Sequence, residues 1–138
     1  MTSHSKGTFD VKVIPQVPDD SAGGPFSRLF LDKRFHGDLD GTSKGQMLGA
    51  GTAVAGSGAY VALELFSGAL NGRRGSFILQ HTGTMTREVP TLIVTVVPDS
   101  GTDQLTGLAG KMTIIVAGGQ HSYEFEYRLG DARLRDEP

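Results

Sequence analysis

The sequence has no cysteine among its 138 residues, which excludes disulfides, thiol redox chemistry and thiolate metal ligands. The formal net charge is only −2, and no basic stretch is present that would neutralise phosphates, so we predict no nucleic-acid partner. No apolar run approaches the roughly 18 residues of a membrane-spanning helix. Residues 1–9, MTSHSKGTF, lack the apolar segment of a signal peptide. The sequence therefore predicts a cytoplasmic protein that does not enter a membrane.

The sequence also lacks a nucleotide-binding loop. The dipeptide Gly110-Lys111 suggests the pattern G-x-x-x-x-G-K-[S/T], but Leu105 replaces the first glycine and Met112 replaces the hydroxyl residue. No G-x-G-x-x-G is present, and the histidines have no metal-ligand spacing. We therefore predict no cofactor and no metal site.

Glycine, by contrast, is abundant, with 20 residues, which is about twice its usual share of roughly 7%. The glycines separate short runs rich in Val, Ile, Leu, Phe and Thr, a spacing typical of strands joined by tight turns. Alternating apolar and polar residues predict eight strands and no long helix. The expected strands are 7–16, 26–39, 46–55, 60–70, 75–84, 89–97, 111–117 and 121–129.

The turns between these strands carry glycine or proline. Asn71-Gly72 between two strands is a strong hairpin signal, because a type I′ turn needs positive φ at both central positions. DGTSKG, residues 40–45, is expected to be a second turn. Eight strands in this order suit a sandwich or a barrel, and a barrel is favoured because closure removes exposed edges. We predict one all-β domain over residues 1–138, an eight-stranded antiparallel β-barrel, with residues 1–6 and 130–138 as flexible tails.

The segment SGTDQLTGLAGKM, residues 100–112, connects two expected strands. Residues 99–110 are expected to hold one short helical turn, with Leu105 and Leu108 as an apolar plug for one end of the barrel. The segment resembles the S-G-T-x-x-[L/F]-x-G-x-x-G connector of allene oxide cyclases and plant dirigent proteins. FHGDL and YEFEYRLG are also similar to segments of the cyclases. This resemblance implies the allene oxide cyclase-like barrel.

Several longer segments, in the same order, resemble the bacterial family DUF3224. They are KGTFDVK, RFHGDLDG, ALELFSGALNGRRGSFILQHTGTM, VVPDSGTDQLTGLAGKM and HSYEFEYRL. The sequence is identified as a member of this family, which implies the same barrel and no particular activity. The cyclases use an asparagine and a cysteine at their site, whereas this chain has no cysteine and its one asparagine is in a turn.

Glu64 and His81 are the catalytic candidates. Glu64 is the only charged residue between Lys44 and Arg73, and a carboxylate in a strand centre either faces water or is buried with a partner. Across the hairpin, position 64 opposes 79 and position 62 opposes 81, so Glu64 and His81 share a face. One interpretation is an acid–base pair with a raised Glu64 pKa. The other is an outward carboxylate and a structural histidine.

Aromatic and aliphatic residues on the same faces are the candidates for substrate binding: Tyr60, Phe66, Phe77, Leu79, Tyr123, Phe125 and Tyr127. A buried phenol needs a hydrogen-bonding partner, so Tyr123 or Tyr127 can bind a ligand oxygen, while Phe125 also fits a filled core. Arg28, Arg34 and His36 are interpreted as solvent-facing, with an anion-binding rim as the alternative.

The sequence leads to two main functional hypotheses. The first is a cofactor-independent isomerase or cyclase that acts on a small hydrophobic, oxygenated substrate, lipid-like or polyketide-like, in a barrel cavity. The second is a barrel that binds such a molecule without changing it. A packed barrel that serves as a subunit interface is a third possibility. The run VPTLIVTVV is apolar on both faces, so we predict a homo-oligomer, a dimer or trimer, as the resemblance to the cyclases also implies.

Overall fold

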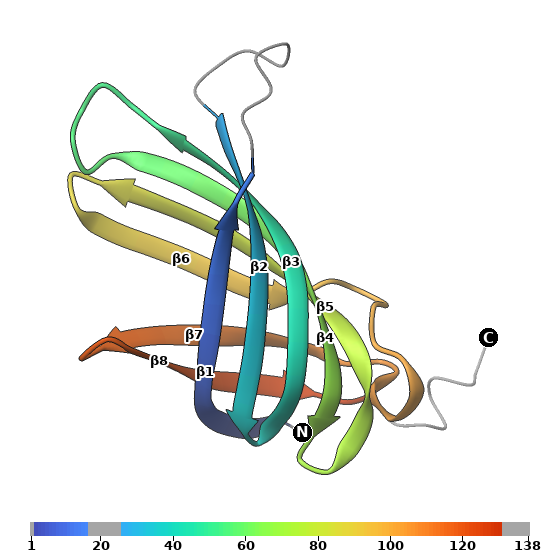
Figure 1. Cartoon of the computed structure of the whole chain (residues 1–138). Coiled ribbons are helices and arrows are strands. Elements are labelled where there is room, and N and C mark those ends of the chain that lie inside the picture. Colours follow the sequence, from blue (N-terminus) through green and yellow to red (C-terminus); the bar gives the residue numbers. More distant parts are fainter. Residues whose placement is uncertain (1, 17–25, 131–138) are drawn as a thin grey trace.

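The computed structural model describes residues 2–16 and 26–130 as a closed, eight-stranded antiparallel barrel (Figure 1). Each strand pairs with its neighbours in the chain, and β8 returns to β1. The predicted fold class is therefore confirmed. The strands are β1 (Ser3–Pro15), β2 (Phe26–Gly37), β3 (Leu39–Gly51), β4 (Gly58–Leu70), β5 (Arg73–Thr86), β6 (Val89–Val96), β7 (Ala109–Ala117) and β8 (Gln120–Arg128).

The two ends of the chain differ from the expected tails in one respect. Residues 3–6 belong to β1, where they pair with β8, so the expected flexible segment does not extend to residue 6. Residues 131–138 of the expected C-terminal tail lie outside the described residues. No helix in the described ranges has the length and apolar character of a membrane-crossing segment.

The turn between β2 and β3 lies earlier than the sequence predicted. The chain reverses at Gly37, whose φ is +102°, and Asp38, whereas residues 40–45 continue within β3. The Tyr123 hydroxyl stabilises this position, because it accepts a hydrogen bond from the Leu39 N–H at 2.8 Å and donates to the His36 carbonyl at 3.0 Å. Asp38 also exchanges hydrogen bonds with Lys6 of β1, so distant segments on both sides hold this turn. The prediction of a turn at 40–45 was therefore wrong. The strand predicted over 46–55 exists but has other bounds, since β3 begins at Leu39 and ends at Gly51.

The hairpin between β4 and β5 is confirmed. Asn71 and Gly72 have φ values of 48° and 84°, as a type I′ turn requires. Glu64 opposes Leu79 and Ala62 opposes His81, which is the predicted register. Inward-facing side chains therefore alternate along both strands as expected.

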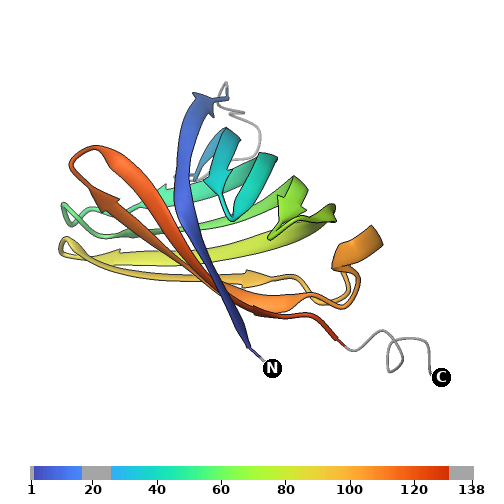
Figure 2. The same cartoon turned by 90° about the horizontal axis from the view of Figure 1, so that it is seen from below.

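One end of the barrel is filled by an aromatic core and a plug. The core contains Phe35, Phe66, Phe77 and Phe125, all at most 1% exposed. A 3-10 helix, η2 (Asp103–Leu105), covers this end beside the β4–β5 hairpin (Figure 2). Leu105 and Leu108 are buried, as predicted for the plug.

The other end of the barrel is open. Some side chains that lie on the same strand face as the buried ones, and so face inward, are exposed there: Val13 by 50%, Met85 by 44% and Leu92 by 38%. The barrel is closed by few residue pairs on one side, because β6 pairs with β7 at only two positions, Val94↔Met112 and Thr95↔Lys111. Figure 1 shows β6 and β7 diverging from this point. The barrel thus has a packed half and an accessible apolar half.

Candidate functional site

A buried polar cluster lies between the packed half and the open half, centred on Glu64 of β4. Glu64 Oε2 is 2.7 Å from Lys33 Nζ of β2 and 2.6 Å from His81 Nε2 of β5. Glu64 Oε1 accepts a hydrogen bond from Ser43 Oγ of β3 at 2.7 Å. Four consecutive strands therefore each contribute one polar side chain to this cluster. We name Lys33, Ser43, Glu64 and His81 the Glu64 cluster.

Glycine at position 45 makes room for this arrangement. Gly45 of β3 lies directly opposite Glu64, between the strand that carries Glu64 and the strand that carries Lys33. A Cβ atom on Gly45 would lie 2.6 Å from the Cβ atom of Glu64 and 2.4 Å from the Leu63 carbonyl oxygen. Because position 45 has no side chain, β3 and β4 can approach closely at Glu64.

The cluster is removed from water, and its charges compensate one another. Glu64 is 1% exposed, Lys33 6% and His81 3%. Burial by itself raises the pKa of Glu64, but the hydrogen bond from His81 and the positive charge of Lys33 outweigh it and lower the pKa to about 2. The raised Glu64 pKa expected from the sequence is therefore wrong. The Lys33 ammonium also lies 4.8 Å from the centroid of the Phe9 ring, a favourable cation–π geometry.

Tyr60 extends the cluster toward the open end. Its hydroxyl lies 3.3 Å from Nδ1 of His81, and its ring is half-buried. Glu64 is ionised at neutral pH and only accepts hydrogen bonds, so Nε2 of His81 must carry a proton. In the neutral imidazole, Nδ1 then accepts the Tyr60 O–H. The pKa of Tyr60 is raised by burial and by the charge of Glu64, so the phenol keeps its proton.

The structure thus brings three of the predicted site residues together, Tyr60, Glu64 and His81, and places the others elsewhere. Phe66, Phe77, Leu79 and Phe125 pack in the hydrophobic core. The Tyr123 hydroxyl bonds the β2–β3 turn, and the Tyr127 hydroxyl accepts a hydrogen bond from Asn71 Nδ2. Both phenols are therefore used within the fold at the closed end of the barrel.

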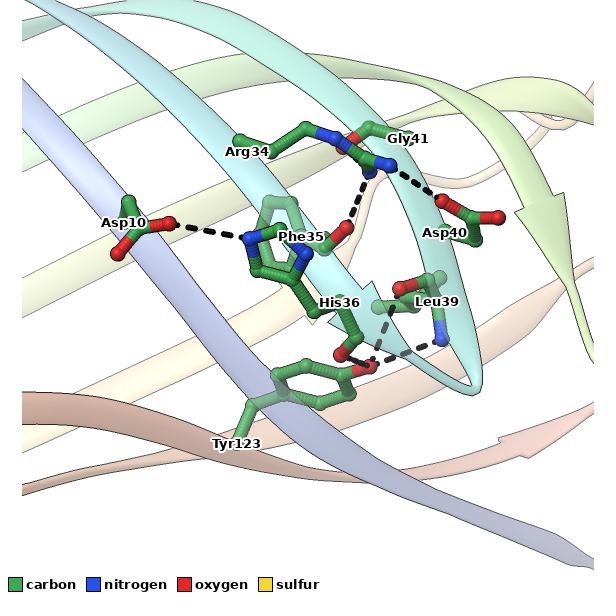
Figure 3. A network of polar contacts seen from close by, with 8 residues as sticks. All are labelled: Asp10, Arg34, Phe35, His36, Leu39, Asp40, Gly41 and Tyr123. Carbon is green, nitrogen blue, oxygen red and sulfur yellow. Dashed lines mark hydrogen bonds and ion pairs between the residues drawn. The ribbon is translucent and has the colours of Figure 1, made fainter.

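The charged face of β2 lies outside the barrel, as its alternation predicted. Arg34 forms an ion pair with Asp40 at 2.7 Å, and His36 contacts Asp10 at 3.0 Å (Figure 3). Two of the three side chains proposed for an anion-binding rim, Arg34 and His36, are therefore already paired with carboxylates of this chain. Arg28, the third, has no ion pair within the described part of the chain.

A hollow of about 770 Å³ lies on the outer surface of β3, β4 and β5. Its lining is mostly outward-facing, and Glu64 and His81 border it from the other side of the sheet. This hollow is therefore separate from the open end of the barrel, and the interior hydrophobic cavity expected from the sequence is not supported. Within the described ranges, no group of three or more His, Asp or Glu side chains could hold a metal ion.

Lys33 and Ser43 are the members of the Glu64 cluster that sequence reasoning missed. Lys33 shares its parity with Leu31 and Phe35, so it is a charged residue on an otherwise apolar strand face. That exception was a usable signal. Ser43 lies in the segment expected to be a turn, so its direction was not predictable.

Comparison with known proteins places the chain in a family. Residues 5–127 match the family model described as "Protein of unknown function (DUF3224)". The chain is also similar to a protein of unknown function from the DUF3224 family of Shewanella oneidensis MR-1, whose crystal structure was determined at 1.84 Å resolution. The identity is 46% and the TM-score 0.89, with 96% of this chain and 100% of that chain covered. No curated protein matches the chain. On the family match and the shared barrel, the chain belongs to the DUF3224 family.

Proposed function

We propose that this protein is a cofactor-independent isomerase or cyclase, of the allene oxide cyclase-like type, for a small hydrophobic and oxygenated molecule. The observation that carries the proposal is the hydrogen-bonded series from Tyr60 through His81 to the ionised Glu64. It connects a half-buried phenol on the open side of the barrel, through the imidazole that can accept its proton, to a buried carboxylate. The substrate would occupy the open half of the barrel, with its oxygen on the Tyr60 hydroxyl.

The series has the properties of a proton relay. When His81 Nδ1 is unprotonated, it can take the Tyr60 proton while the phenol oxygen receives one from an enol or hydroxyl of the substrate. When His81 is an imidazolium, the direction reverses, and the phenol donates to a carbonyl oxygen. Glu64 stabilises the imidazolium and holds its orientation, as the carboxylate does in a Ser-His-Asp triad. A proton that leaves and returns within one reaction cycle is what an isomerisation needs, and it requires no redox partner.

The surroundings of the relay suit an apolar substrate. The inward-facing side chains of the open half include Val13, Met85 and Leu92. A flexible apolar molecule bound against this wall would be oriented by it and would displace water from the contact, and orientation is the main device expected for a cyclisation. The resemblance of residues 100–110 and of β8 to allene oxide cyclases also favours this class of reaction.

A non-catalytic binding barrel is the second candidate, and one observation favours it. The Glu64 carboxylate is already saturated by Lys33, Ser43 and His81. A buried charge that is fully paired can be purely structural. In that case Tyr60 would serve as a hydrogen-bonding anchor for a ligand oxygen, without proton transfer.

An assay for isomer formation distinguishes the isomerase from the binding barrel. The protein is incubated with an organic extract of apolar cell metabolites, and liquid chromatography with mass spectrometry detects compounds replaced by species of equal mass and different retention time. An isomerase makes such products, and Tyr60→Phe and His81→Gln reduce their rate by roughly 100-fold or more. Tyr127→Phe, which removes a phenol at the closed end, is the matched control and keeps the rate.

A binding barrel gives a different pattern in the same samples. Compounds remain bound through gel filtration but are recovered unchanged, and Tyr60→Phe weakens retention by about tenfold or less. The isomerase proposal fails if no equal-mass product forms. Both candidates fail if the protein neither converts nor retains any compound of the extract.

A further inference from the structure

A patch of large apolar side chains is exposed on the outside of the barrel. Leu48, Val61, Leu63 and Leu65 are between 42% and 55% exposed, and Ile78 lies beside Leu65 across β4 and β5. They lie on adjacent strands β3, β4 and β5 and border the hollow of about 770 Å³. We name these five residues the outer apolar face. A contiguous exposed patch of this kind marks an interaction surface.

The outer apolar face is bordered by charges of both signs that form no ion pair with other described residues. Asp32 and Lys44 lie directly opposite each other on β2 and β3, yet neither they nor Arg28 form an ion pair within the described residues. Gln46 and Gln80 complete the polar border of the hollow. An apolar centre with a polar rim is the composition of a protein–protein interface.

We propose that a second copy of this chain covers the outer apolar face, in a two-fold symmetric dimer. A two-fold axis through Leu63 brings the same patch of both copies together, as an isologous interface requires. Such an axis can place Lys44 of one copy against Asp32 of the other, twice, so the unpaired charges complement one another. An anionic membrane surface would instead favour a rim of one sign, with clustered lysine or arginine.

The relief of the surface supports this pairing. A second hollow of about 350 Å³ adjoins the first and shares Lys44, Gly45 and Gln46 in its lining. These three residues line both hollows, and Ile14 and Phe30, exposed by 45% and 40%, line the second one. Exposed apolar side chains of one copy can therefore enter the hollows of the other, which the shape complementarity of a stable dimer needs.

This surface differs from the one that the sequence suggested. Residues 89–97 were expected to contact a neighbour through the outer face of their strand. Ile93 of β6 is indeed 58% exposed, but it lies opposite Thr82 at the border of the patch. On β4 three successive outward-facing side chains, Val61, Leu63 and Leu65, are large, apolar and exposed, whereas on β6 a threonine separates the outward-facing Val89 and Ile93. The proposed dimer is therefore centred two strands away from the expected one.

The first test measures the mass of the full chain in solution by size-exclusion chromatography with multi-angle light scattering, over a dilution series. We expect twice the 14.6 kDa mass of one chain. Leu63→Glu buries a charge in the proposed interface and should raise the dissociation constant by roughly tenfold or more. Ile115→Glu, on the outer face of β7 and 40% exposed, is the matched control and should leave the mass unchanged.

The second test exchanges charges. Asp32→Lys and Lys44→Asp each place like charges together and should weaken the dimer, whereas the double variant restores opposite charges and should recover it. Circular dichroism checks that every variant remains folded. The proposal is overturned by a monomer or a trimer at all concentrations, or by a Leu63→Glu dimer as tight as the wild type. Equal effects of the Leu63 and Ile115 changes, or a double variant no tighter than the single ones, overturn it as well. A monomer that binds anionic vesicles through this patch would identify a lipid surface instead.

Discussion

Replacement of Glu64 by glutamine tests the electrostatic account of the barrel interior. Glutamine keeps the size of the side chain but removes the negative charge. Lys33, at 6% exposure, would then hold its ammonium group in the interior without a counter-ion. Removal of one partner from a buried ion pair costs about 3–5 kcal/mol. We therefore expect Glu64→Gln to lower the free energy of unfolding by this amount at pH 7.

The pKa of Glu64 determines how this effect depends on pH. A carboxyl group with a depressed pKa stabilises the fold above its unfolded pKa, and the contribution disappears as the pH falls through the folded pKa. The pKa of Glu64 falls from 4.5, its ordinary value, to about 2 in the folded protein. At roughly 1.36 kcal/mol per pKa unit, this difference contributes about 3 kcal/mol to the free energy of unfolding at neutral pH. About 2 kcal/mol of this should already be lost at pH 3. The difference in the free energy of unfolding between the wild type and Glu64→Gln should therefore be smaller at pH 3 than at pH 7 by that amount.

Urea unfolding followed by circular dichroism, at pH 7 and at pH 3, measures both quantities. Glu124→Gln, an exposed change on β8, is the control and should stay within about 0.5 kcal/mol of wild type. The double variant Lys33→Met with Glu64→Leu should recover much of the loss, because it removes both charges together. A Glu64→Gln protein within about 1 kcal/mol of wild type at pH 7 would refute the reasoning. A difference that is equal at both pH values would refute it as well.

Three further changes probe the frame that holds the Glu64 cluster, all measured by urea unfolding. Leu105→Ala empties the plug and should cost about 2–5 kcal/mol; a loss below about 1 kcal/mol would show that η2 does not seal the barrel. Tyr123→Phe leaves the buried Leu39 N–H without its partner and should cost about 1–3 kcal/mol. A smaller loss would show that the other contacts of the β2–β3 turn are enough to hold it. Gly75→Ala places a Cβ 2.2 Å from the Thr102 carbonyl oxygen and should destabilise clearly, whereas Gly51→Ala, which meets no atom within 4 Å, should not.

Local patterns were enough for most of the fold. Alternation identified the strands because one face of each is buried, and a single Asn-Gly pair placed the β4–β5 turn. That register made Glu64 and His81 neighbours before any tertiary information was available. The Leu105 and Leu108 plug was also visible, since apolar residues in a glycine-rich connector need an apolar place to pack.

Predictions failed where distant segments decide the outcome. The turn at Gly37 depends on a hydroxyl from Tyr123, 84 residues from the Leu39 N–H that it binds. The low pKa of Glu64 depends on the hydrogen bond from His81 and on the charge of Lys33, which comes from β2, two strands away. The Tyr123 contact leaves no periodic trace in the sequence, and the exceptional charge of Lys33 on an apolar strand face did not show which carboxylate it would reach.

The sequence by itself determined that this chain forms consecutive antiparallel strands, each with one apolar face. Pairing between strands that follow one another in the chain depends on short-range alternation and on turn residues. Only the tertiary structure decided that the carboxyl group at position 64 is a charged, fully paired centre inside the barrel. Its ionisation depends on burial and on cationic and polar side chains from three other strands, and these meet only once the sheet has closed.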